Sequence, residues 1–342
     1  MGFRSSNRKS KIQIRKWAKR FAFLVALTVC ATKADAQQTG KIRRIGFLDA
    51  STASGMAVLI DTFRQEMSKL GWIEGRNITI EFRFAEQKLE RLPELAVELV
   101  RLKVDLIVVV STPSALAAKS ATTMIPIVMT NAGDPVAAGL VASLARPGGN
   151  ITGFSGLAPE LNTKRLEVLN DTVPKLVGVG VLRPVGTSIG QDLQLKELRP
   201  AALALKLRLE EIETHADAKG LESAFKSAKQ KQIGAIMTTG SRPFFAERKR
   251  IVELAVKYRL PAIYFQKDFV DQGGLMSYGV NYDDLFRRSA HYTDKILRGA
   301  KPADLPVQQA TKFDFVINLK AAKQIGLTLS PEFLSRANQV IR

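Results

Sequence analysis

The sequence predicts an α/β protein built as two lobes, each a parallel sheet covered by helices. Apolar strand-like runs alternate with amphipathic helical segments from about residue 41 onward. The alternation occurs twice, before and after a segment rich in Gly, Pro and Asn at 133–156. About 306 residues follow the N-terminal segment, more than one compact core usually holds. We therefore expect two similar lobes in tandem.

The first lobe is predicted from short apolar strands and one clearly amphipathic helix. The run at 104–110 is apolar almost throughout, as in a parallel strand covered on both faces. The segment 53–70 has helical periodicity that places Val58, Phe63, Met67 and Leu70 on one face. Strands are expected at 41–49, 77–84, 104–110 and 125–130, and helices at 53–70, 88–102 and from Pro113.

The second lobe repeats the pattern from residue 161 onward. Helices are expected at 161–171, 192–205, 218–229, 244–258 and 283–297, and strands at 177–182, 208–213, 235–239 and 261–266. Breaks at 133–156, 273–279 and 299–306 are interpreted as three crossings between the lobes, an arrangement that suits hinged closure. The first lobe is thus expected to hold 41–153 plus about 280–300, and the second 157–275 plus about 303–342.

The N-terminus has the pattern of a secretory signal peptide. A stretch with eight basic residues leads into an apolar run at 21–31, followed by Ala34-Asp35-Ala36, so 1–36 is predicted to be cleaved off. The run of about 11 residues is short for a bilayer-spanning helix, which needs roughly 20, although a retained anchor is the alternative. Cys30 lies within the apolar run, upstream of the predicted cleavage site, which does not fit a lipoprotein signal. We expect a soluble, periplasmic mature protein without cysteine.

The charge of the chain does not by itself indicate a nucleic-acid partner. The formal charge of +19 comes from 51 basic and 32 acidic residues, of which nine and one lie in 1–36. This leaves 42 basic and 31 acidic residues, or +11. The remaining basic residues are dispersed beside glutamates, with no arginine-rich arm or zinc-finger spacing, so we expect a solvated basic surface and no nucleic-acid binding. We also expect a monomer.

In the first lobe, small polar loops follow the predicted strands. Ligands of open parallel sheets bind at the carboxyl ends of strands. The loops supply eight candidate ligand-binding residues: Asp49, Ser51, Ser54, Ser111, Thr112, Ser114, Asn131 and Asp134. Ser111 and Thr112 precede a helix opened by Pro113, whose free N–H groups would suit a carboxylate or phosphate. The alternative for each residue is a purely structural helix cap.

The second lobe offers further candidates in its loops at 184–188, 239–242 and 266–268. The residues chosen are Arg183, Thr239, Gln266, Asp268 and Tyr278, the last as an aromatic face for a planar ligand or as filling of the hinge region. Tyr282 is a weaker candidate of the same kind.

The inventory for catalysis is poor. His215 and His291 are the two histidines, and neither belongs to an HExxH or similar cluster. Ser155 lacks the second glycine of a GxSxG elbow, and Gly178 and Gly180 begin a GxGxxG pattern that Arg183 interrupts. We expect no enzyme activity, no cofactor and no metal site.

Two long blocks give the sequence a family resemblance. DPVAAGLVASLARPGGNITGFS at 134–155 and the block from GGLMSYGVNYDD to KQIGLTL at 273–329 resemble the ABC transporter substrate-binding proteins that include the tryptophan-type binding proteins. The resemblance covers nearly the whole mature chain. It implies a type I periplasmic binding protein with two Rossmann-like lobes and three crossings, a small-molecule ligand such as an amino acid or small carboxylate, and an ABC permease as partner.

One departure from the family pattern affects the ligand. Family members tend to carry an asparagine-proline turn after the strand at 177–182, whereas this sequence has Arg183-Pro184-Val185-Gly186. An arginine at the cleft rim would recognise an acidic group, or it would be a solvated loop residue. Two other functions stay open at this point: a ligand-binding subunit that feeds a membrane sensor, and a secreted α/β enzyme.

Overall fold

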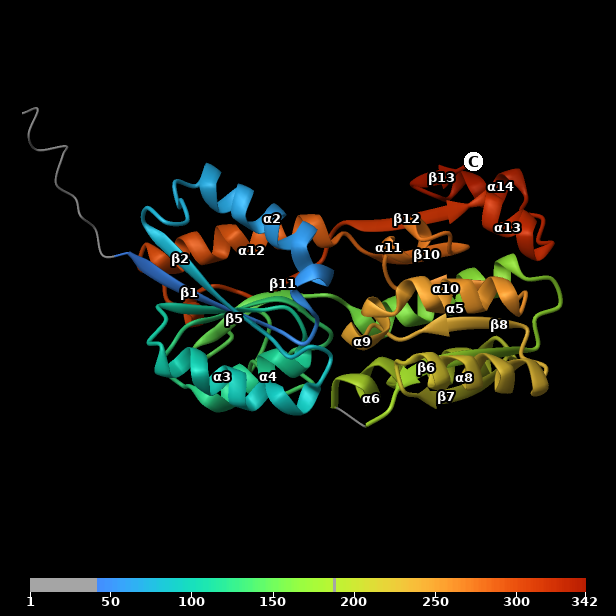
Figure 1. Ribbon diagram of the computed structural model, residues 1–342, viewed down its shortest axis with the longest axis horizontal. Helices are drawn as coiled ribbons and strands as arrows, with labels where there is room; N and C mark the ends of the chain where they lie inside the picture. Colours follow the sequence, from blue (N-terminus) through green and yellow to red (C-terminus); the bar gives the residue numbers. More distant parts are fainter. Residues whose placement is uncertain (1–41, 187–188) are drawn as a thin grey trace, which may run out of the picture. The chain divides into compact units, whose positions relative to one another are not determined.

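The protein contains two separate sheets, as the sequence predicts. The computed structural model describes residues 42–186 and 189–342, and Arg43–Arg342 form one compact unit. Within these residues one sheet has six strands and the other seven (Figure 1). We call the residues around the six-stranded sheet the first lobe and those around the seven-stranded sheet the second lobe. The predicted signal peptide, with Cys30, lies outside the described residues.

The first sheet is parallel throughout, with the strand order β11-β5-β4-β3-β1-β2. Its strands are β1 (Arg43–Asp49), β2 (Ile78–Phe84), β3 (Leu106–Val109), β4 (Ile127–Ala132), β5 (Ile151–Ser155) and β11 (Gln308–Gln309). One face packs on α2 (Ala53–Lys69) and α12 (Tyr282–Leu297), and the other on α3 (Leu92–Arg101) and α4 (Thr112–Ala121). Because both faces are covered, β3 is buried along its whole length and reads as a continuous apolar run.

The second sheet has the order β13-β12-β10-β9-β8-β6-β7 and is parallel except where β12 runs against β10. Its strands are β6 (Gly178–Pro184), β7 (Arg208–Thr214), β8 (Ala235–Thr238), β9 (Ala262–Tyr264), β10 (Met276–Val280), β12 (Phe313–Asn318) and β13 (Gln339–Ile341). One face packs on α5 (Ala158–Thr172), α6 (Ile189–Lys196), α7 (Leu198–Ala204), α13 (Leu319–Ile325) and α14 (Pro331–Ser335). The other packs on α8 (Ala218–Gln230), α9 (Arg242–Ala246), α10 (Arg248–Lys257) and α11 (Asp268–Asp271).

Two strands lie inside segments that the sequence predicts to be crossings. β5 ends the segment 133–156, and β10 occupies most of 273–279. The glycines there reflect tight packing rather than loops. A Cβ atom on Gly153 would lie 2.1 Å from the Met129 carbonyl oxygen, and one on Gly279 would lie 2.0 Å from that of Phe265. Glycine within a strand often marks such a close approach of another backbone, so both segments were wrongly read as irregular.

The chain passes between the lobes three times. The passages lie between β5 and α5, between β10 and α12 at Asn281, and between β11 and β12 at 310–312. The third passage comes later than the expected break at 299–306, because Gln308–Gln309 still pairs with β5 of the first sheet. That pairing uses backbone groups of a polar segment, so the sequence there lacks the apolar alternation that would predict a strand.

The packing face of α2 differs slightly from its prediction. Met56, Ile60, Phe63 and Met67 are buried, whereas Val58 is 76% exposed and was wrongly placed on the buried face. A helix buries one stripe, and position 58 points away from the stripe that 56, 60 and 63 define. In the described part of the chain, no helix is both long and apolar enough to cross a membrane.

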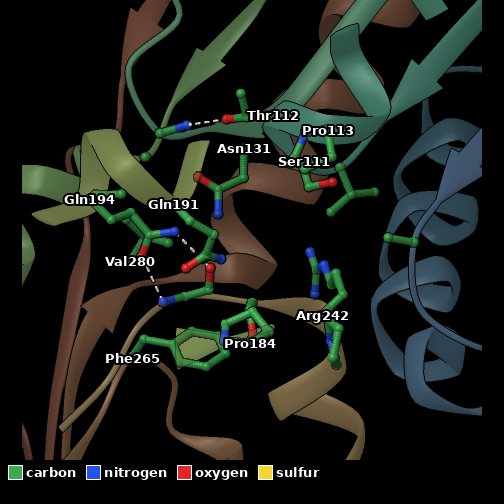
Figure 2. Close-up of a pocket in the computed structure, with 18 of the residues that line it drawn as sticks. Ser111, Thr112, Pro113, Asn131, Pro184, Gln191, Gln194, Arg242, Phe265 and Val280 are labelled. Carbon is green, nitrogen blue, oxygen red and sulfur yellow. Dashed lines mark hydrogen bonds between the residues drawn. The ribbon is translucent and has the colours of Figure 1, made fainter. Parts of the chain in front are cut away.

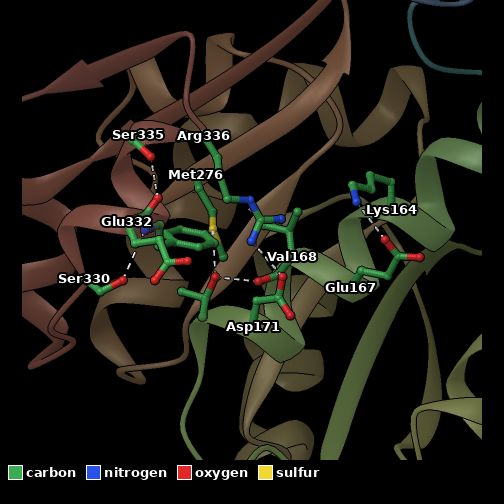
Figure 3. Close-up of polar contacts among 11 residues, drawn as sticks. Lys164, Glu167, Val168, Asp171, Met276, Ser330, Glu332, Ser335 and Arg336 are labelled. Atoms are coloured by element: carbon green, nitrogen blue, oxygen red, sulfur yellow. Dashed lines mark hydrogen bonds and ion pairs between the residues drawn. The ribbon is translucent and has the colours of Figure 1, made fainter.

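Helix α5 is fixed firmly to the second lobe (Figure 3). Leu166 and Leu169 are fully buried against the second sheet. At the C-terminal end of the helix, Arg336 Nη1 lies 2.8 Å from Asp171 Oδ2, which ties α5 to the residue that follows α14. The side chains on the N-terminal half of α5 are therefore held in place relative to the second sheet.

Candidate functional site: a cavity between the lobes

A cavity of about 110 Å³ opens between the two lobes. Its walls come from the carboxyl ends of strands in both sheets and from the helix starts that follow them, the place where open parallel sheets bind ligands. From the first lobe the lining includes Ala50, Val110, Ser111, Thr112, Pro113, Asn131 and Gly133. From the second lobe it includes Leu161, Arg165, Pro184, Gln191, Gln194, Ser241, Arg242, Pro243 and Phe265 (Figure 2).

The start of α4 forms one wall, as the sequence suggests. Ser111 is the N-cap, and its hydroxyl lies 3.4 Å from the Ser114 N–H and 3.0 Å from the Ser114 hydroxyl. Thr112 Oγ1 accepts a hydrogen bond of 3.1 Å from the Gly133 N–H, so it ties the start of α4 to the loop after β4. Ser111 and Thr112 line the cavity, whereas Ser114 is fully buried behind them.

Asn131 reaches the cavity from the end of β4. Its Nδ2 donates a hydrogen bond of 2.9 Å to the hydroxyl of Tyr282, which also lines the cavity. Burial raises the pKa of Tyr282. A Cβ atom on Gly156 would lie 1.8 Å from Asn131 Oδ1, so a larger residue here would displace the Asn131 side chain. Asp134, in contrast, caps the following turn by accepting from the Val136 and Ala137 N–H groups and does not line the cavity.

The loop after β1 contributes less than expected. Asp49 is fully buried: its Oδ1 accepts a hydrogen bond of 2.6 Å from the Ser51 N–H, and its Oδ2 lies 3.5 Å from Nε of Arg242 in the opposite lobe. Burial raises the pKa of Asp49, and the guanidinium of Arg242 partly opposes this. Ser51 is buried, Ser54 is exposed, and neither lines the cavity, although Ala50 does.

In the second lobe, none of the five chosen residues lines the cavity. Arg183 pairs with Glu211 at 3.3 Å, so the proposed rim arginine is occupied within its own lobe, while the next residue, Pro184, does face the cavity. The Thr239 hydroxyl donates to the Leu182 carbonyl. Gln266 is buried, and burial raises the pKa of Asp268.

Tyr278 lies next to the site without entering it. Its ring contacts Phe313 and Phe315, with ring centroids 6.4 and 5.8 Å away. Its carbonyl oxygen accepts a hydrogen bond of 2.6 Å from Arg165 Nε. The alternative that the ring fills the hinge region therefore describes it better than stacking on a ligand.

Sequence reasoning missed the polar network on the second-lobe side of the cavity. Gln194 Nε2 donates to the Gly240 carbonyl and its Oε1 accepts from the Gly240 N–H, at 2.8 and 2.7 Å. Asn162 Nδ2 donates to the Gln194 carbonyl, and Asn162 Oδ1 accepts from Arg165 Nη1. In the sequence Asn162 and Arg165 look like ordinary polar positions of a surface helix. Arg242 belongs to the candidate loop at 239–242, but it was not among the predicted ligand-binding residues.

The two histidines lie away from the cavity. His215 is exposed after β7, and His291 pairs with Glu66 on the surface at 3.2 Å. Among residues 42–186 and 189–342, no group of three or more His, Cys, Asp or Glu side chains is placed to hold a metal ion.

Known proteins resemble this chain over most of its length. A "Tyrosine-binding protein" of Clostridioides difficile is 28% identical over 265 residues, 78% of this chain and 75% of that protein. The crystal structure of a Streptococcus pneumoniae protein, solved as an ABC domain in complex with L-Trp, is 25% identical, with a TM-score of 0.79 over 87% of this chain and 99% of the other. A ligand-free, open substrate-binding protein with adhesive properties from Clostridium difficile is 26% identical, with a TM-score of 0.63 over 88% and 99%.

These similarities confirm the type I periplasmic binding fold and the expectation that the chain is not an enzyme, because the relatives are substrate-binding proteins. Residues 52–341 match the profile of one family, described as ABC transporter substrate binding protein. The match covers both lobes and all three crossings, so the chain belongs to the ABC transporter substrate binding protein family.

Proposed function

We propose that this chain is the exported solute-binding component of an ABC importer, which encloses a small molecule between its lobes and presents it to a permease in the inner membrane. The observation that carries the proposal is the cavity that both lobes line, with polar groups from α4, β4, α5 and α9 directed toward one space. Ligand sites of small molecules are concave, largely apolar and equipped with a few convergent polar groups.

The lobes supply the mechanism for capture. A ligand that contacts both walls stabilises the closed arrangement, and its differential affinity for the closed state sets how far the population shifts. Three crossings, one of them at a single residue, Asn281, allow the lobes to move as units. At nearly equal identity, the chain overlays better on the complex with L-Trp than on the open, ligand-free relative.

Ser111, Thr112 and Asn131 are proposed to contact the ligand from the first lobe. All three line the cavity, and Ser111 caps a helix start, a position whose free N–H groups suit a carboxylate. No catalytic group is required, since enclosure alone performs the task.

A ligand panel tests capture. The protein, freed of carried-over solute, is screened by thermal unfolding against amino acids, aromatic acids, small carboxylates and sugars. A ligand at about 100 times its Kd adds about 2.7 kcal/mol of stability, which shifts Tm by about 5 °C for a chain of this size. Silence across the panel would contradict capture of a common small molecule.

Export and partnership need separate tests. We expect the chain in the periplasmic fraction, with a mass that corresponds to cleavage after Ala36. Deleting its gene should abolish uptake of the identified ligand. If uptake persists while a ligand-dependent transcriptional response is lost, the chain serves a membrane sensor instead.

A further inference from the structure

The charged side chains around the cavity are both arginines. Of the described residues that line it, Arg165 and Arg242 carry charge, and Asp, Glu and Lys do not occur among them. Outside the described residues, positions 187 and 188 are Thr and Ser, and Asp35 is the one acidic residue within 1–41. The part of the sequence that the structure does not describe therefore contains one carboxylate side chain. The cavity wall is therefore cationic.

Arg165 is a buried cation whose partners are neutral. The residue is 4% exposed. Its Nε donates a hydrogen bond to the Tyr278 carbonyl, and its Nη1 donates one to Asn162 Oδ1. Its Nη2 donates to none of the described residues, and no described carboxylate forms an ion pair with this guanidinium. Burial lowers the pKa of Arg165 to about 10. An ion that is buried without a counter-charge is costly, so an anion that enters the cavity gains a strong partner.

Arg242 supplies a second unfilled donor. The side chain is 6% exposed, its Nε faces Asp49 at 3.5 Å, and its Nη1 is buried with no hydrogen-bond partner. Figure 2 shows the guanidinium extending into the space below Ser111. Among the described residues, Asp49 is the carboxylate that pairs with Arg242, and none pairs with Arg165. Asp49 is fully buried and outside the cavity lining. Arg165 is therefore left without a carboxylate partner among the described residues.

The remainder of the wall suits a small carbon skeleton. Leu161, Pro184, Phe265 and Val280 give it apolar surface. An apolar cavity of about 150 Å³ holds a benzene molecule, so the cavity of about 110 Å³ has room for a skeleton of about one ring or smaller.

From these observations we infer that the ligand is a small organic acid without an ammonium group, whose carboxylate is bound by Arg165 with Nη1 of Arg242 as a second donor. The inference rests on the proposed function and specifies its substrate class. An α-amino acid of the same skeleton also brings an ammonium group, which would be buried in a wall that already carries two guanidinium groups. Loss of the amino group removes that repulsion and keeps the carboxylate contact.

Matched ligands test the inference on the unaltered protein. By titration calorimetry we compare 3-methylbutanoate with L-valine, 4-methylpentanoate with L-leucine, and benzoate with benzamide. At least one acid should bind about tenfold or more tightly than its amino-acid or amide counterpart, the range expected for one charge-assisted contact. If an amino acid binds as tightly as its deaminated counterpart, or if no acid of the series binds, the inference is wrong. If no compound of the wider thermal-unfolding panel binds either, the proposed capture of a small molecule is also wrong.

Two variants assign the contact. Arg165→Gln should weaken binding of the best acid by about 10- to 100-fold and leave binding of its amide nearly unchanged, because the amide makes no charged contact. Asn131→Asp keeps the shape of a lining residue and adds a negative charge. It should therefore weaken binding of the acid and reduce the ratio of its affinity to that of the amino acid.

A matched control and a fallback keep the test decisive. Arg199→Gln removes an arginine whose side chain is 57% exposed and which pairs with Glu211 outside the cavity, and it should change neither affinity. Thermal unfolding verifies that each variant folds. If Arg165→Gln does not fold, Arg165→Lys and the wild-type ligand pairs decide the question. Equal losses for acid and amide in Arg165→Gln would mean a structural role and would overturn the assignment.

Discussion

Replacing Arg242 with methionine isolates the electrostatic contact between the lobes. Methionine keeps much of the length of the side chain but leaves the buried carboxylate of Asp49 without its guanidinium, 3.5 Å away. At that distance and an effective dielectric constant of about 20, the attraction is about 5 kcal/mol. Removal of one partner from a buried ion pair costs about 3–5 kcal/mol, so we expect the free energy of unfolding to fall by about that amount at neutral pH.

The loss should depend on pH in a defined direction. Burial already raises the pKa of Asp49, and removal of Arg242 takes away the interaction that opposes this rise. A carboxyl group whose pKa is higher in the folded than in the unfolded protein binds its proton more tightly when folded. Its contribution to stability is complete below the unfolded pKa and is lost as the pH rises through the folded one. The deficit of Arg242→Met should therefore shrink as the pH falls.

Urea denaturation at about pH 7.5 and about pH 5 measures this difference. The double variant Arg242→Met with Asp49→Asn should recover most of the stability at neutral pH, because no buried charge is left unpaired. Arg199→Met, an exposed arginine that pairs with Glu211, should cost less than about 1 kcal/mol. An equal loss at both pH values, without rescue by Asp49→Asn, would refute the reasoning and point to the contact of Arg242 with the Tyr282 ring, 5.5 Å away.

Two further changes probe the walls of the cavity. In Gly156→Ala the new Cβ would meet Asn131 Oδ1 at 1.8 Å, so the Asn131–Tyr282 hydrogen bond should break. We expect a loss of about 1–3 kcal/mol of stability and weaker ligand binding, both measured by calorimetry. The control is Gly149→Ala, where a Cβ meets nothing within 4 Å. Changing Ser111 and Thr112 together to alanine should weaken binding by about 1–3 kcal/mol, measured by calorimetry on the folded variant, since both residues line the cavity and their hydroxyls hold the start of α4. Unchanged affinity in that double variant would remove both hydroxyls from the binding site.

Local patterns were sufficient for the architecture because they report burial directly. Strands such as β3 are apolar throughout because helices cover both faces of the sheet, and amphipathic periods such as that of α2 mark one buried stripe. The errors occurred where the pattern has another cause. Gly153 and Gly279 are strand glycines selected by a neighbouring backbone, and β11 pairs through backbone groups alone.

The sequence predicted cavity-lining residues correctly only where the place of a residue relative to the end of a strand decides whether it lines the cavity. Ser111 and Thr112 follow β3 closely and Asn131 lies at the end of β4, so the rule for parallel sheets places them at the cavity. Asp134 and Arg183 satisfy the same rule but are occupied by a cap and by an ion pair with Glu211. Sequence position does not show which partner a polar group has in space.

Short-range periodicity and the geometry of parallel sheets were enough to predict the fold class, the two-lobed organisation and the loops that meet between the lobes. The tertiary structure alone decided the charge of the cavity. Arg165 and Arg242 come from separate helices of the second lobe, and Asp49, the carboxylate that pairs with Arg242, belongs to the first. Burial and pairing are properties of contacts between residues distant in sequence, and those contacts give an otherwise ordinary helical arginine an unmatched charge.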